Sequence, residues 1–129
     1  MTGSPFLRIN EESLNIVDAF MDDEKAFFAL DTGASQTVID LNLLLILGYD
    51  LSQAIRLDRF ETASGVMQAH IFRVRELRAL GLVCTDFEIC AFDFLERGLA
   101  SEFLGLLGLD FFEGQKLCIN FRLSEITVG

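Results

Sequence analysis

The chain has 129 residues, of which 51% are hydrophobic and 23% are charged, with a single proline. This length allows one hydrophobic core and is too short for two domains of ordinary size, and the hydrophobic content excludes disorder as the main state. The formal net charge of −10 opposes binding to nucleic acid, because that binding depends on clustered lysine and arginine. We therefore expect one folded domain, residues 1–129, and no nucleic-acid partner.

Membrane association and secretion are not expected either. No apolar run approaches the roughly 18 residues that a membrane-spanning helix needs. The N-terminal stretch MTGSPFLRIN lacks a basic start followed by an apolar segment, so it does not resemble a secretory signal. We therefore expect no membrane partner and a cytoplasmic location.

The three cysteines, Cys84, Cys90 and Cys118, are odd in number and form no C-x-x-C pair. A disulfide framework or a zinc site is therefore not expected, and free cysteine usually packs as a small buried hydrophobic side chain. Cys84 and Cys90 also have the same parity, so a single strand would place both on one face.

The first predicted element is a β-hairpin. Its strands, residues 14–21 and 25–30, flank the acidic residues 22–24, which we interpret as a solvated turn. Both faces of the second strand are apolar, so this strand is expected to lie in the centre of a sheet. Asp31 then stands at the end of a buried strand.

A short helix is predicted next, after a further strand over residues 37–39. Asp40 fits the N-cap of this helix and Gly48 its C-terminal stop, which gives about two turns over residues 41–47. A second turn-like stretch follows at residues 51–54.

Two strand pairs are predicted in the middle of the chain. Residues 57–62 and 66–74 flank a turn that contains glycine, which is typical of a hairpin. Residues 75–80 and 83–94 form the second pair, which is broken near Gly81.

The last part of the chain predicts a loop over residues 95–103, a short helical stretch over residues 109–113 and a closing hairpin of residues 116–121 and 125–128. Many short strands with one or two short helices are typical of an all-β barrel or sandwich. His70, the only histidine, has neither a nucleophile nor a metal ligand as a partner in this pattern, so we expect it at the surface or at an interface.

The turn formed by Asp31, Thr32 and Gly33 is the strongest candidate for a chemical site. An apolar strand leads into it, the small residues Ala34 and Ser35 follow, and a second apolar strand leaves it. Placing an ionisable residue at the end of a buried strand costs free energy, so such a residue is expected to have bonding partners or a function.

Three ordered motifs resemble those of retroviral-type aspartic peptidases, the single-domain relatives of pepsin. They are ALDTGAS at residues 29–35, the hairpin TASGV at residues 62–66, where that family carries its flap, and LLGLDFF at residues 106–112, where that family has two apolar residues and a glycine before its helix. Their order and spacing agree with the family over nearly the whole chain. The resemblance implies an all-β, retropepsin-like closed barrel with one or two short helices.

The resemblance also implies hydrolysis of peptide bonds between two carboxylates, of which one is ionised and one is protonated. This chain supplies one such aspartate, Asp31, because Asp110 lacks the Thr-Gly turn and is interpreted as a helix-end residue. A twofold axis between the Asp31 residues of two copies would supply the second carboxylate. We therefore expect a homodimeric aspartic endopeptidase that cleaves extended peptide or protein substrates near bulky apolar residues and needs no cofactor or metal.

The same resemblance implies a role for each motif. Thr32 would hydrogen-bond across the dimer, and Gly33 would let the backbone approach the carboxylate closely. Ala34 stands where pepsin-like lobes have Ser or Thr, so we expect an activity optimum at weakly acidic pH. The flap that closes over substrate would be formed by Ala63, Ser64, Gly65 and Val66. The pocket wall would be formed by Leu106, Leu107 and Gly108.

One alternative stays open, a non-catalytic member of the same fold that dimerises and binds a partner peptide. The intact sequence Asp31-Thr32-Gly33 argues against this alternative. Cleavage of a peptide library separates the enzyme from the binding module.

Overall fold

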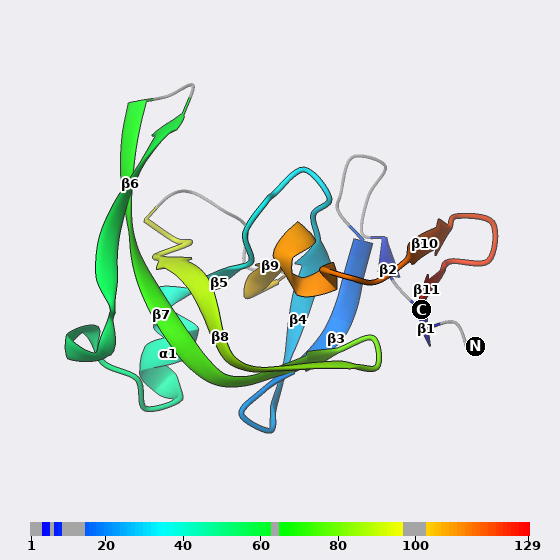
Figure 1. Cartoon of the computed structure of the whole chain (residues 1–129), viewed down its shortest axis with the longest axis horizontal. Helices are drawn as coiled ribbons and strands as arrows, with labels where there is room; N and C mark the ends of the chain where they lie inside the picture. Colours follow the sequence, from blue (N-terminus) through cyan, green and yellow to red (C-terminus); the bar gives the residue numbers. More distant parts are fainter. Residues whose placement is uncertain (1–3, 6, 9–14, 63–64, 97–102) are drawn as a thin grey trace.

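The computed structural model describes residues 4–5, 7–8, 15–62, 65–96 and 103–129, which form a mainly β structure (Figure 1). In these residues, no helix has the length and apolar character needed to cross a membrane. The elements in chain order are β1 (Ser4–Pro5), β2 (Leu7–Arg8), β3 (Asn15–Met21), β4 (Glu24–Leu30), β5 (Val38–Asp40), α1 (Leu41–Ile46), the 3₁₀ helix η1 (Leu51–Gln53), β6 (Arg56–Thr62), β7 (Gly65–Ala79), β8 (Leu82–Phe92), β9 (Gly105–Leu107), the 3₁₀ helix η2 (Leu109–Phe112), β10 (Leu117–Asn120) and β11 (Glu125–Val128).

One sheet closes on itself to form a barrel. Its strands follow the order β3-β4-β9-β5-β8-β7, and β7 pairs back with β3, for example at Ala79 and Ala19. Closure removes the free edges that an open sheet would expose. The predicted all-β closed barrel with short helices is therefore confirmed. Strand β6 continues the sheet beyond β7, and these two strands form an arm that projects from the barrel (Figure 1).

The hairpin of β3 and β4 agrees with the prediction. Asp22 and Asp23 form its turn with φ angles of 48° and 74°, a left-handed conformation that Asp tolerates better than most residues. The interpretation of residues 22–24 as a solvated turn is wrong for Asp22. Its side chain is only 14% exposed and accepts hydrogen bonds from Tyr49 and Arg75.

Strand β4 lies in the centre of the sheet, as predicted, between β3 and β9. Phe28 and Ala29 have no exposed surface, because one lies in the barrel core and the other is covered on the opposite face. Phe27 is an exception, since 45% of it is exposed. Full burial of a side chain such as Phe28 contributes about 1.5–3 kcal/mol.

Helix α1 follows β5 as predicted. The Asp40 carboxylate accepts a hydrogen bond from the Asn42 backbone N–H at the helix start, and Gly48, with φ of +95°, follows its end. The helix ends at Ile46, one residue before the predicted end. Leu43 and Leu44 pack it on the core.

Strand β7 corrects the prediction of separate strands at residues 66–74 and 75–80. It is continuous over Gly65–Ala79, because its first half pairs with β6, its last residues pair with β3, and β8 pairs along most of it. The predicted break near Gly81 is confirmed, since Leu80 and Gly81 turn with φ of 54° and 80°.

The cysteines correct two predictions. Cys84 and Cys90 both lie on β8, but Cys84 packs against the main core, whereas Cys90 belongs to a separate cluster with Ala69 and Ile71. The alternation of faces is broken between them at Asp86, where φ is 48°. Cys118 is exposed on β10 and is not a buried hydrophobic side chain.

A second, three-stranded sheet stands beside the barrel, in the order β1-β11-β10. It confirms the predicted closing hairpin and adds β1 to it, with Ser4 opposite Ile126. Figure 1 shows both chain ends at this side of the molecule.

Candidate active site

Asp31 lies in the loop between β4 and β5, half-buried at the end of β4. Its backbone N–H donates to the Leu107 carbonyl at 3.0 Å, which extends the pairing of β4 with β9 by one residue. Its carboxylate oxygen Oδ1 accepts a hydrogen bond from the Gly33 N–H at 3.0 Å. A Cβ atom on Gly33 would lie 3.3 Å from that oxygen, so glycine lets the turn close tightly around the carboxylate.

The rest of the loop presents small residues to solvent. Thr32, Gly33 and Ser35 are exposed, and Ala34 is half-buried. The Ala34 N–H donates to the Asp31 carbonyl at 3.1 Å, and its own carbonyl accepts from the Leu109 N–H at 2.9 Å. The acid-bearing turn is therefore open on one side and bound to the segment after β9 on the other.

Thr37 and Asp110 form a polar contact that the sequence reasoning did not find. Thr37 has no exposed surface, and its backbone N–H donates to both Asp110 carboxylate oxygens at 2.9 and 3.0 Å. The Thr37 hydroxyl donates to Asp110 Oδ1 at 2.7 Å and accepts from the Gly108 N–H at 3.1 Å. Asp110 does lie in the first turn of η2, near a helix end, but its side chain also holds the loop.

The segment predicted as a pocket wall lies behind the loop. Leu107 is fully buried in the barrel core and Leu106 is half-buried. A Cβ atom on Gly108 would lie 2.6 Å from the Gln36 carbonyl carbon, so glycine permits this close approach. A pocket-wall role for Leu106, Leu107 and Gly108 stays a prediction.

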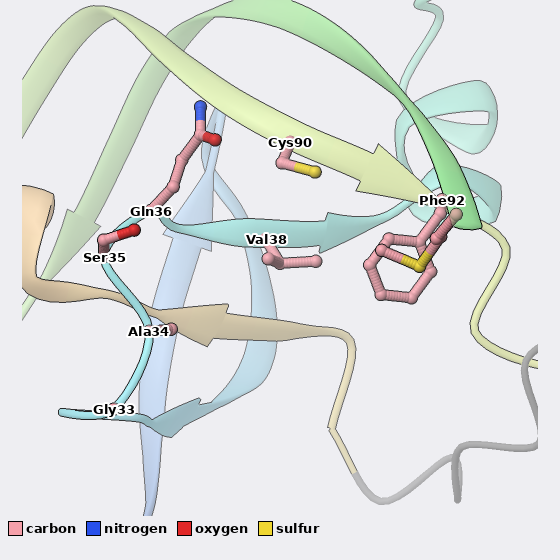
Figure 2. A pocket seen from close by; sticks show the side chains of 8 residues that line it. Gly33, Ala34, Ser35, Gln36, Val38, Cys90 and Phe92 are labelled. Atoms are coloured by element: carbon pink, nitrogen blue, oxygen red, sulfur yellow. The ribbon is translucent and has the colours of Figure 1, made fainter. Parts of the chain in front are cut away.

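A cavity of about 440 Å³ opens beside the acid-bearing turn (Figure 2). Figure 2 shows Val38 on β5 and Cys90 and Phe92 on β8, with Gly33 and Ala34 on the loop nearby. Its volume lies in the range of about 300–1,000 Å³ typical of ligand sites. The residues that line it are Gly33, Ala34, Ser35, Gln36, Val38, Met67, Cys90 and Phe92.

Among the described residues, none that lines the cavity has a charged side chain. Cys90 is 4% exposed, and burial raises the pKa of its thiol to about 11, with a smaller contribution from Asp58. The thiol is therefore neutral at neutral pH. Met67, Cys90 and Phe92 were not predicted as site residues, because only the folded barrel brings β7 and β8 beside the loop.

The arm of β6 and β7 carries the predicted flap. Gly65 has φ of +128°, a conformation that favours glycine, and both Gly65 and Val66 are exposed. Ala63 and Ser64, the other predicted flap residues, lie outside the described residues. Met67 brings this arm to the cavity. His70 is half-buried, with its ring 6.4 Å from that of Phe72.

Known proteins share this architecture. A family model described as aspartyl protease matches residues 17–111, a span that holds the Asp31 turn, the arm and Asp110. No curated protein sequence matches the chain. The crystal structure of a retropepsin-like aspartic protease from Rickettsia conorii is similar, with a TM-score of 0.71 over 99% of this chain and 96% of that chain, at 21% sequence identity. This likeness shows a retropepsin-like fold.

Proposed function

We propose that this chain, which belongs to the aspartyl protease family and has a retropepsin-like fold, is one half of a homodimeric aspartic endopeptidase. The observation that carries the proposal is the Asp31 turn, in which a half-buried carboxylate is held by the Gly33 N–H next to an uncharged cavity. This is an acid placed where a substrate can reach it.

In the proposed reaction, Asp31 of each copy supplies one of two carboxyl groups beside a water molecule. The ionised carboxylate takes a proton from the water as the water oxygen attacks the carbonyl carbon of the peptide bond. The protonated carboxyl donates its proton to the carbonyl oxygen. When the C–N bond breaks, the carboxyl that took the water proton gives it to the amine nitrogen, and a hydroxyl of the intermediate returns a proton to the other carboxylate. Two like charges this close cannot both ionise easily, so activity is highest at acidic pH. Ala34 offers no hydroxyl to the turn, which favours a weakly acidic optimum.

The proposed substrates are extended peptides or proteins with an apolar side chain near the cut. The uncharged cavity accepts such a side chain, whereas a charged one would lose its hydration without gaining a partner among the lining residues. The exposed arm, with Gly65 and Val66 near its end, closes over the peptide and binds its backbone. Thr32 is exposed beside the carboxylate and bonds to the second copy. A cytoplasmic location stays a prediction from the sequence.

The test replaces Asp31 with Asn, which keeps the side-chain shape and removes the acid. Asp18→Asn is the matched control, because Asp18 is an exposed carboxylate on β3 that pairs only with Lys25 across the hairpin in the described contacts. Cleavage of a peptide library is measured with sedimentation of the same samples. We expect Asp31→Asn to abolish cleavage while the dimer remains, and Asp18→Asn to cleave normally.

Two outcomes would overturn the proposal. A chain that stays monomeric at all concentrations could not assemble the carboxyl pair. A wild-type dimer that binds library peptides but leaves them intact at every pH would instead be the non-catalytic binding module.

A further inference from the structure

Four consecutive residues, beginning with the last residue of β9, each make a hydrogen bond to the loop that carries Asp31. The Leu107 carbonyl accepts from the Asp31 N–H, and the Leu109 N–H donates to the Ala34 carbonyl. The Gly108 N–H donates to the Thr37 hydroxyl, and Asp110 accepts from Thr37. The loop is therefore held at its start, middle and end by one short segment.

The contact at Thr37 is directional. A carboxylate is only an acceptor, so the Thr37 hydroxyl must donate to Asp110 and is left free to accept from the Gly108 N–H. Successive hydrogen bonds of this kind strengthen one another where water is excluded. Because Thr37 has no exposed surface, water cannot replace either partner.

The close approach of the two segments depends on Gly108. A side chain there would meet the backbone of Gln36 and Thr37 at 2.6 to 2.9 Å. The Gly108 N–H can therefore reach the Thr37 hydroxyl only because residue 108 has no Cβ. Neither Thr37 nor Asp110 lines the cavity, so neither contacts a substrate there.

We propose that Thr37 and Asp110 are positioning residues, which fix the loop so that Asp31 is held in its reactive geometry. This inference rests on the proposed peptidase function. A catalytic group displaced by about 1 Å can cost about a hundredfold in rate. Loss of the contact therefore lowers kcat more than it raises KM, because part of the cavity lining, Val38, Met67, Cys90 and Phe92, lies on strands outside the loop.

The experiment compares Thr37→Val, which removes the hydroxyl, with Thr37→Ser, which keeps it. We expect Thr37→Val to lower kcat at least about tenfold with KM within about twofold, and Thr37→Ser to retain kcat within about threefold. Asp110→Asn keeps one acceptor oxygen but loses the charge, which weakens the hydrogen bonds from Thr37 by about half. The kcat of Asp110→Asn should therefore lie between those of Thr37→Val and Thr37→Ser. Met21→Ala is the stability control, since Met21 is fully buried at the β3–β4 end of the barrel.

Hydrogen exchange of the same variants separates this inference from the peptidase proposal. Thr37→Val should speed exchange of the amides at residues 31–37 relative to those of β3, whether or not the wild type cleaves peptides. If wild type cleaves no peptide but the loop amides respond, Thr37 and Asp110 hold the loop, but the peptidase proposal fails and the catalytic part of this inference fails with it. If Thr37→Val lowers kcat no more than Met21→Ala does, or leaves loop exchange unchanged, the inference is overturned.

Discussion

Tyr49 offers the sharpest test of how the barrel is closed. Its hydroxyl donates to Asp22 Oδ2 at 2.7 Å and accepts from the Arg75 N–H at 2.9 Å, and the Arg75 guanidinium lies 4.3 Å from its ring. Asp22 also accepts from the Glu76 N–H at 3.1 Å. These hydrogen bonds lie at Arg75 and Glu76 of β7, where the pairing with β8 passes over Arg75. The side chains of Asp22, in the β3–β4 turn, and of Tyr49, three residues after α1, thus take the place of backbone partners.

The perturbation is Tyr49→Phe, which removes the hydroxyl and keeps the ring. The Arg75 N–H then loses the acceptor of a part-buried hydrogen bond to Tyr49, which is 4% exposed, and an unsatisfied backbone group of this kind costs about 1–3 kcal/mol. Asp22 keeps its bonds to Arg75 and Glu76, so its loss is smaller, about 0.5–1 kcal/mol. We expect a total loss of about 1.5–4 kcal/mol in the free energy of unfolding. A native domain has a free energy of unfolding of about 5–15 kcal/mol, so this loss is a large fraction of the stability.

Urea unfolding at one fixed protein concentration measures this loss. With a slope of about 1.5–2 kcal/mol per molar urea, the midpoint should fall by about 0.8–2.7 M. Asp23→Asn is the matched control, because Asp23 stands beside Asp22 in the same turn but its side chain is 87% exposed and, among the described residues, forms an ion pair only with Arg78. Its midpoint should change by less than about 0.3 M. Equal midpoints for Tyr49→Phe and wild type would refute the reasoning.

Four further predictions concern the cavity and its supporting segment. Burial raises the pKa of Cys90 to about 11, so a thiol reagent at neutral pH should label the exposed Cys118 well before Cys90, and equal rates would contradict this. Because that folded pKa lies above the ordinary value of 9.0, the stability that Cys90 contributes should be complete below about pH 9 and lost by about pH 11 in alkaline unfolding. Cys90→Leu should fill the cavity and lower kcat/KM for peptides with bulky side chains at least about tenfold relative to small ones, whereas an equal loss for all peptides would exclude Cys90 from the substrate pocket. Gly108→Ala should lower the free energy of unfolding by about 1–3 kcal/mol, because its Cβ would meet the Gln36 backbone at 2.6 Å, and an unchanged melting temperature would refute that packing.

Elements that depend on neighbouring residues were predictable from the sequence. Asp40 accepts from the Asn42 backbone N–H two residues away, and Gly48 ends the helix with a positive φ. The same holds for the β3–β4 turn, where residues that tolerate a left-handed backbone join two apolar strands. In each case the signal and the structure lie within a few residues of each other.

Features that depend on the folded barrel were not predictable in this way. Cys84 and Cys90 were expected on one face, but the left-handed backbone at Asp86 reverses the alternation between them. No local sequence pattern predicts that break, which lies opposite the part of β7 between its pairing with β6 and its pairing with β3. Thr37 and Asp110 are 73 residues apart, so no local spacing connects them.

The state of Asp110 bears directly on the need for a second copy. Among the described residues, it is the carboxylate bonded to the loop of Asp31, and so the natural rival for the second catalytic acid. Both of its oxygens accept hydrogen bonds from Thr37, which has no exposed surface. An acid used in this way is directed at a buried residue rather than at solvent, which makes it a poor partner for a reacting water. In the proposed reaction the second carboxyl group therefore comes from Asp31 of another copy, which a twofold axis beside the exposed Thr32 and Gly33 would supply.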